Sequence, residues 1–157
     1  MSKKILIFGA TGSVGSSLAK LVKDSSMDAH LIGKNEGEIS NLKEQTGFSY
    51  SIADVTDPNF IETIDKDLEG SEISGIAYCV GSIDLKPLNL VSKKDYLKSF
   101  ELNLFPIVEI IKKFKDNLKK NKSSVVLFST VAVKQGFPNH SIISPVKASL
   151  EGLTVSL

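Results

Sequence analysis

Three glycines stand three residues apart near the start of the chain, directly after an apolar run. The run KILIFG covers residues 4–9, and a pattern typical of an amphipathic helix begins near Ser13. Glycine lets the chain turn sharply, lets backbone approach a phosphate, and lets a helix pack closely on a strand. The first amides of a helix are unpaired and carry a partial positive charge. The segment therefore predicts a dinucleotide-binding loop formed by Gly9, Thr11, Gly12, Ser13, Val14 and Gly15.

The end of the second apolar run carries a cation and no acid. In LIGKNEGEI, the expected strand tip holds Gly33, Lys34 and Asn35, and the first acidic residue is Glu36. An acidic residue at such a tip binds the ribose 2′-hydroxyl of NAD, whereas a cation accommodates the 2′-phosphate of NADP. We therefore expect NADP(H) to be preferred over NAD(H), with Lys34 as the contact to the 2′-phosphate and Asn35 beside it as a further cofactor-binding residue. A solvated loop lysine is the alternative interpretation.

Short apolar runs alternate with helical patterns along the whole chain. We expect strands at 4–9, 29–34, 48–53, 74–80 and 124–130, and helices at 13–24, 36–46, 58–68, 92–120 and from about 144. Runs that are apolar throughout indicate strands covered on both faces. Strict alternation with long crossovers indicates right-handed connections between parallel strands. The predicted fold class is α/β, a Rossmann-type doubly wound parallel β-sheet in three α/β/α layers.

The length suits one domain over residues 1–157, because a chain of this size buries a sizeable core. The last helical pattern, KASLEGLTVSL, reaches Leu157 without a glycine cap or a proline stop. We therefore expect the domain to lack a C-terminal portion. A natural end that frays in solvent is the alternative.

A proline lies several turns inside the longest helical pattern. Pro106 in FELNLFPIVEII has no amide hydrogen to donate, and its ring crowds the carbonyl of Leu102. We expect a bend with a freed carbonyl beside Asn103. Two interpretations stand: a helix that curves around the core, or a distortion that belongs to a site at Asn103.

Composition argues against nucleic-acid, membrane and metal-binding functions. The formal net charge is +1, and the lysine-rich run at 112–122 closes the longest helix, where cations complement the macrodipole. No apolar run approaches the length of a membrane span. One cysteine, Cys79, and two distant histidines make no metal ligand set. A single cysteine fits the reducing cytoplasm, where we expect the protein to reside.

With these segments in place, the chain resembles the short-chain dehydrogenase/reductase family over essentially its whole length. FGATGSVG is similar to the GxxGxxG variant of the family's glycine motif, and ADVTD to the acidic residue and hydrophobe after its third strand. AYCVG stands where NNAG is usual, so only the glycine is kept. The resemblance implies adenine contacts from Asp54 and Val55, and backbone contacts to the nucleotide from Cys79, Val80 and Gly81.

The resemblance extends to the family's catalytic segments. In the family, a tyrosine exchanges a proton with the substrate oxygen while a hydride moves to or from nicotinamide. A serine holds that oxygen, and a lysine four residues after the tyrosine lowers the tyrosine pKa and binds the nicotinamide ribose. Carried across, Lys147 is the lysine, Thr130 takes the serine's place and Asn103 is the active-site asparagine. The tyrosine falls on Ile143, which has no proton to give.

Two hypotheses follow from this pattern. The first is an oxidoreductase that transfers a hydride between NADP(H) and a carbonyl or alcohol, with an altered acid–base site. The second is a catalytically inactive NAD(P)-binding regulatory or scaffold protein of the same fold. Lys147, Asn103 and Thr130 favour the first, and Ile143 favours the second. His140, in the preceding loop, is a candidate replacement acid, although loop histidines are more often solvated. The resemblance also implies a homodimer or homotetramer.

Overall fold

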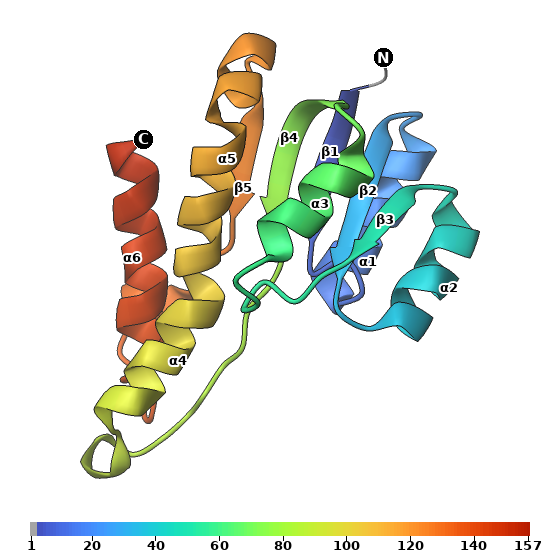
Figure 1. Cartoon of the computed structure of the whole chain (residues 1–157). Coiled ribbons are helices and arrows are strands. Elements are labelled where there is room, and N and C mark those ends of the chain that lie inside the picture. Colours follow the sequence, from blue (N-terminus) through green and yellow to red (C-terminus); the bar gives the residue numbers. More distant parts are fainter. Residues whose placement is uncertain (1–2) are drawn as a thin grey trace.

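Five parallel strands form one sheet in the computed structural model of the chain, which describes residues 3–157 (Figure 1). They are β1 (Lys3–Phe8), β2 (Asp28–Gly33), β3 (Ser49–Ile52), β4 (Glu72–Tyr78) and β5 (Ser124–Leu127), in the order β3-β2-β1-β4-β5. The chain moves outward from β1 in one direction and then returns to β4 on its other side. A crevice is therefore expected at the carboxyl ends of β1 and β4. This topology confirms the predicted fold class.

Helices cover both faces of the sheet. One face carries α1 (Ser13–Asp24) and α2 (Glu36–Thr46), and the other carries α3 (Phe60–Leu68) and α5 (Phe105–Asn121). The final helix, α6 (Ile143–Ser156), contacts α4 (Lys93–Asn103). Successive β1 residues serve opposite cores, since Ile7 packs under α1 and α2 while Leu6 and Phe8 pack under α3 and α5. The strand is apolar throughout for that reason.

The predicted helix over 92–120 is two helices, α4 and α5, with the break at Leu104. Ser92 and Asp95 open α4 with a reciprocal capping box, and Pro106 lies in the first turn of α5. The carbonyl of Leu102 accepts a hydrogen bond of 2.6 Å from the hydroxyl of Tyr78 on β4. The expected freed carbonyl beside Asn103 is therefore present, and its donor comes from the sheet.

The third helix begins two residues later than the sequence pattern indicates. The carboxylate of Asp57 accepts from the amide of Asn59 at 2.8 Å, so a turn precedes α3. Asp and Asn compete for backbone groups in this way at helix entrances.

Within residues 3–157, none of the helices has the combination of length and apolar character that crossing a membrane requires.

A buried histidine ties β2 to its neighbours. His30 is fully buried, with Nδ1 2.8 Å from the hydroxyl of Ser49 and Nε2 2.7 Å from that of Ser51. Ser51 donates to Asp67 on α3 at 2.6 Å, and Lys4 donates to Ser49 at 2.9 Å. Ser51 must then accept from Nε2–H while Ser49 donates to Nδ1. The network holds His30 neutral in one tautomer.

Stability is expected to decrease as the pH is lowered, because of His30. Burial, and secondarily Lys4, lower the pKa of His30 from 6.5 to about 4, although Asp67 and Asp28 act in the opposite direction. Between these pH values His30 is protonated in the unfolded chain but neutral in the folded protein. The free energy of unfolding should be highest above pH 6.5 and should decline by up to about 3 kcal/mol toward pH 4.

Urea unfolding across this pH range measures the effect in the wild type and in His30→Gln. The variant should show a flatter dependence on pH, because its residue 30 does not titrate. His140→Gln replaces the other histidine of the chain and serves as the control for histidine substitution itself. Equal pH dependence in wild type and His30→Gln would contradict the assignment.

Candidate active site

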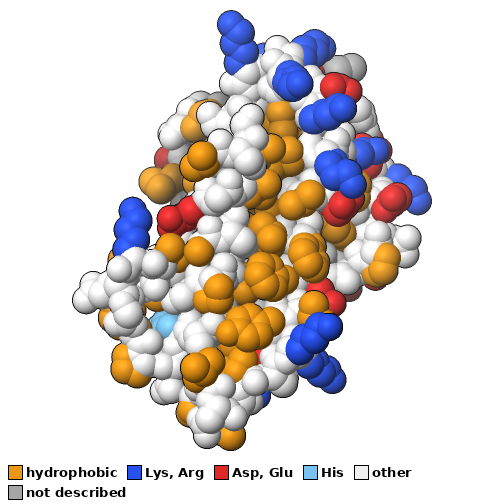
Figure 2. Space-filling model, turned by 90° about the vertical axis from the view of Figure 1, so that its left-hand side faces the viewer, with side chains coloured by type: hydrophobic (Ala, Val, Ile, Leu, Met, Phe, Trp, Pro, Cys, Tyr) orange, Lys and Arg blue, Asp and Glu red, His pale blue; other side chains and the backbone are white. Residues whose placement is uncertain are grey.

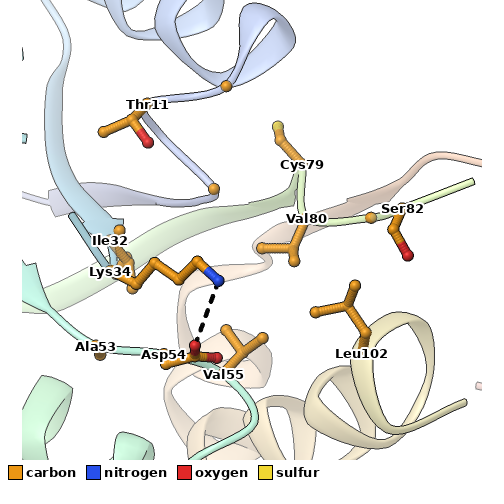
Figure 3. Close-up of a pocket in the computed structure, with 14 residues that line it drawn as sticks. Thr11, Ile32, Lys34, Ala53, Asp54, Val55, Cys79, Val80, Ser82 and Leu102 are labelled. Atoms are coloured by element: carbon orange, nitrogen blue, oxygen red, sulfur yellow. Dashed lines mark ion pairs between the residues drawn. The ribbon is translucent and has the colours of Figure 1, made fainter. Parts of the chain in front are cut away.

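A cavity of about 390 Å³ opens at the carboxyl ends of the central strands (Figure 3). It brings together residues that are far apart in sequence: the glycine loop after β1, the tip of β2, the segment after β3 and the segment after β4. The lining residues are Gly9, Thr11, Gly12, Ile32, Gly33, Lys34, Ala53, Asp54, Val55, Cys79, Val80, Gly81, Ser82 and Leu102. Most of the residues expected to contact a nucleotide therefore meet at one site.

The glycine loop is built by close backbone contacts. Gly9 has φ +69°, and a Cβ there would lie 3.0 Å from the backbone of Cys79 and Val80. A Cβ on Gly15 would lie only 2.3 Å from the carbonyl oxygen of Gly9. Gly12 precedes α1 and gives its first turn no side-chain hydrogen bond. The first amides of α1 are thus left for an external acceptor.

Three predicted members of the loop do not line the cavity. Ser13 and Val14 form the exposed first turn of α1, and Gly15 is buried against the backbone of Gly9 and Ala10. Gly15 therefore acts through packing, which holds the helix start beside the loop. Asn35 also lies outside the lining, since its side chain caps α2 by accepting from the amide of Glu38 at 3.1 Å.

A cation and an anion face each other at the tip of β2. The ammonium of Lys34 lies 3.6 Å from the carboxylate of Asp54, as Figure 3 shows. Hydrogen bonds from the amide and hydroxyl of Thr56 lower the pKa of Asp54, with a smaller contribution from Lys34. Both side chains remain open to solvent, so Lys34 is free to turn to a second anion.

Asn103 and Lys147 converge on Gly81. A Cβ added to Gly81 would lie 3.1 Å from Oδ1 of Asn103 and 3.3 Å from Nζ of Lys147. Asn103 is fully buried, donates to the carbonyl of Ser99 at 2.9 Å, and has no hydrogen-bond partner for Oδ1 among the described residues. Lys147 is 9% exposed, and burial lowers its pKa. An unsatisfied acceptor and a buried amine therefore lie beside the part of the cavity wall that Gly81 forms, although neither Asn103 nor Lys147 is itself a lining residue.

The other two predicted catalytic positions are occupied by a hydroxyl with a local partner and by a hydrocarbon. The Oγ1 of Thr130 accepts from the amide of Ala132 at 3.3 Å, which caps the short 3₁₀ turn Val131–Val133. Ile143 is the first residue of α6 and is 2% exposed. It stands one turn before Lys147, so the two share a helix face. The hydrocarbon side chain of Ile143 has no proton to supply.

His140 lies outside the cavity of the glycine loop. Its Nδ1 is 2.7 Å from the carbonyl oxygen of Pro138, and its ring is 5.4 Å from that of Phe137. It lines a second, separate cavity beside the segment before α6. Its position gives no support to a role as the replacement acid.

Several lining residues were not predicted from sequence. Ile32, Gly33, Ala53, Ser82 and Leu102 belong to the wall. The position of Leu102, four residues before Pro106, was the available signal for that residue. Cys79 lines the wall as expected, and burial raises its thiol pKa to about 11. The thiol is therefore protonated near neutral pH, consistent with a backbone role.

Comparisons with known proteins show what the chain is similar to. A family model described as enoyl-(acyl carrier protein) reductase matches residues 9–157. An uncharacterized oxidoreductase of Saccharomyces cerevisiae is 24% identical over 164 residues, which cover 100% of this chain and 65% of that protein. The chain thus spans just under two thirds of this relative.

Solved structures show the same fold. The crystal structure of the yeast protein, described as a short-chain dehydrogenase/reductase, has a TM-score of 0.92 at 22% identity, covering 99% of this chain and 64% of that one. A short-chain dehydrogenase/reductase from Vibrio parahaemolyticus has a TM-score of 0.85 at 23% identity, covering 97% and 72%.

Proposed function

Because the chain belongs to the short-chain dehydrogenase/reductase family of oxidoreductases, which use an NAD(P)-type nucleotide, we propose that it transfers a hydride between NADP(H) and a carbonyl or alcohol. The observation that carries the proposal is the convergence of Asn103 and Lys147 on Gly81, at the wall of the glycine-loop cavity. The chain spans 65% of its yeast relative. The activity that we assign to the whole protein is therefore a proposal.

The residues present fit such a dinucleotide. The uncapped start of α1 suits a pyrophosphate, Lys34 suits a 2′-phosphate, and the unpaired Oδ1 of Asn103 is a buried acceptor that calls for a donor. The cofactor supplies the hydride or accepts it. The protein holds the dinucleotide along its length. Asp54 and Val55 contact the adenine. The backbone of Cys79, Val80 and Gly81 contacts the nucleotide.

The substrate oxygen meets a reduced set of catalytic groups. We assign the hydroxyl of Thr130 to hold that oxygen and the ammonium of Lys147 to stabilise negative charge that develops there. Asn103 orients the groups at the end of the site where Lys147 lies. Because Ile143 has no exchangeable proton, the proton travels by a different route than in relatives with tyrosine, and the acid–base site is altered.

Replacing Lys34 by alanine should reduce the preference for NADPH over NADH by about tenfold, since an exposed charge-assisted contact to the 2′-phosphate would be lost. Fluorescence titration of both reduced cofactors measures the ratio of their Kd values. Lys115→Ala removes an exposed lysine of α5 and serves as the control. An unchanged ratio in Lys34→Ala, or tighter binding of NADH by the wild type, would refute the assignment.

Turnover tests the function directly. A panel of aldehydes and ketones incubated with NADPH should show carbonyl reduction, and Lys147→Ala should lower the rate at least about 100-fold. The loss follows from removing the buried ammonium beside Gly81. Lys134→Ala, which removes an exposed lysine of the neighbouring loop, should retain the wild-type rate. Tight NADPH binding without turnover on any substrate would favour the alternative function.

That alternative is an inactive NAD(P)-binding regulatory or scaffold protein. It is favoured by the identity and burial of Ile143, which leaves the cavity intact while removing the expected proton donor.

We also infer a homodimer or homotetramer that assembles through α4, α5 and α6. Figure 2, which views the molecule from the side on which α6 lies in Figure 1, shows hydrophobic side chains gathered in a band. The single cysteine suits action in the cytoplasm.

A further inference from the structure

Tyr78 joins the strand that carries the nucleotide segment to the helix break that carries Asn103. It is the last residue of β4, directly before Cys79, and only 2% exposed. Its ring packs on Phe8, with centroids 5.9 Å apart, and its hydroxyl donates to the carbonyl of Leu102 at 2.6 Å. The contact spans 24 residues of sequence and crosses from the sheet to α4.

The bonded carbonyl is not an ordinary one. In an unbroken helix, the carbonyl of Leu102 would accept from the amide of residue 106, but Pro106 has no amide hydrogen. A buried carbonyl without a donor is costly, and the hydroxyl of Tyr78 satisfies it. The carbonyl belongs to the same peptide unit as the amide nitrogen of Asn103. Fixing that unit therefore fixes the direction from which the Asn103 side chain departs.

The side chain of Asn103 is held from a second direction. Its Nδ2 donates to the carbonyl of Ser99, which leaves Oδ1 on the opposite side, toward Gly81 and Lys147. Two constraints, one on the backbone and one on the amide group, thus aim a single unpaired acceptor. Because Leu102 also lines the cavity, any rotation of its peptide would move the wall and the acceptor together.

We propose that Tyr78 is a positioning residue for the nicotinamide end of the site, acting through the Leu102 carbonyl on Asn103 and Lys147. The inference rests on the proposed cofactor function. It predicts that the hydroxyl of Tyr78 matters for the half of the dinucleotide near Gly81 and has little effect on the half near Lys34. A residue that only stabilised the fold would affect both halves alike.

The variant Tyr78→Phe removes only the hydroxyl. The Kd for NADPH should rise about fivefold or more, whereas the Kd for adenosine 2′,5′-bisphosphate, which lacks the nicotinamide half, should change less than about twofold. Tyr50→Phe, a hydroxyl removal on β3, is the matched control and should change neither Kd. Equal Kd values in Tyr78→Phe and wild type, or equal losses for both ligands, would overturn the proposal.

Competitive acylation of Lys147 across pH gives a second readout that needs no cofactor. With the acceptor of Asn103 displaced, the ammonium loses a favourable neighbour, so the midpoint of labelling in Tyr78→Phe should move to lower pH. An unmoved midpoint would count against the positioning role. If the wild type binds neither NADPH nor NADH, the proposed function fails. Wild-type binding with unselective Tyr78→Phe results overturns the positioning role alone.

Pro106→Ala tests the same idea without touching Tyr78 and covers the case in which Tyr78→Phe does not fold. The new amide at position 106 competes with Tyr78 for the Leu102 carbonyl and favours a continuous helix. The same selective loss of NADPH binding is expected. Retention of wild-type NADPH affinity in Pro106→Ala would contradict the role given to the helix break.

Discussion

Gly15→Ala is expected to abolish dinucleotide binding and to lower the free energy of unfolding by about 3 kcal/mol or more. The added methyl would lie 2.3 Å from the carbonyl oxygen of Gly9 and 2.8 Å from Cα of Ala10. Both obstacles are backbone atoms, so no side-chain rotation relieves the overlap. The start of α1 must move away from the loop, and its first amides then no longer point at the phosphate position.

Gly152→Ala provides the matched control. Gly152 lies inside α6, and a Cβ there meets no atom within 4 Å. Alanine is the better helix former, so this variant should be as stable as the wild type or up to about 1 kcal/mol more stable. Urea unfolding and NADPH titration of both variants measure the contrast. A Gly15→Ala protein with wild-type stability and affinity would show that α1 does not need its close approach to the loop.

Introducing the missing hydroxyl should have the largest effect on rate. Ile143→Tyr places a phenol one helical turn before Lys147, whose ammonium lowers the phenol pKa from about 10. General acid catalysis contributes roughly 10²–10⁴-fold, and an increase in carbonyl reduction within that range is expected. The measurement is kcat/KM with NADPH on the most reactive carbonyl of the panel.

Ile143→Phe separates the chemistry from the change in volume. Residue 143 is buried, so either aromatic ring strains its packing by a similar amount. Only the tyrosine supplies a proton. If Ile143→Tyr is no faster than Ile143→Phe while both bind NADPH, the pocket around residue 143 is not arranged for proton transfer to a carbonyl.

The parts of the fold that local rules determine could be predicted from the sequence. The bounds of α1 and α2 match expectation at both ends because periodicity, glycines and the Asn35 cap act within a few residues. The break at Leu104 was expected only as a bend. The hydrogen bond that Tyr78 donates to the carbonyl of Leu102 at this break could not be predicted, because a contact across 24 residues depends on how α4 lies on the sheet.

The site divides in the same way. The glycine loop could be predicted from spacing, and its residues Gly9, Thr11 and Gly12 line one cavity with Lys34 and Asp54. The meeting of Asn103 with Lys147 required the family pattern, since 44 residues separate them in the printed sequence. The network of His30 gave no sequence signal, because Ser49 and Ser51 become its neighbours only through the register of β2 with β3.

The position of β5 at one edge of the sheet has a consequence for local opening. Within residues 3–157, β1 is paired on both sides, whereas β5 is paired with β4 alone and Val126 is 48% exposed. In hydrogen exchange, amides of β1 should exchange only through global unfolding, and those of β5 through smaller fluctuations. The phosphate loop follows β1, while Thr130 follows β5. The proposed adenosine half of the site is therefore anchored to the most protected strand, and the proposed catalytic half to one of the least protected.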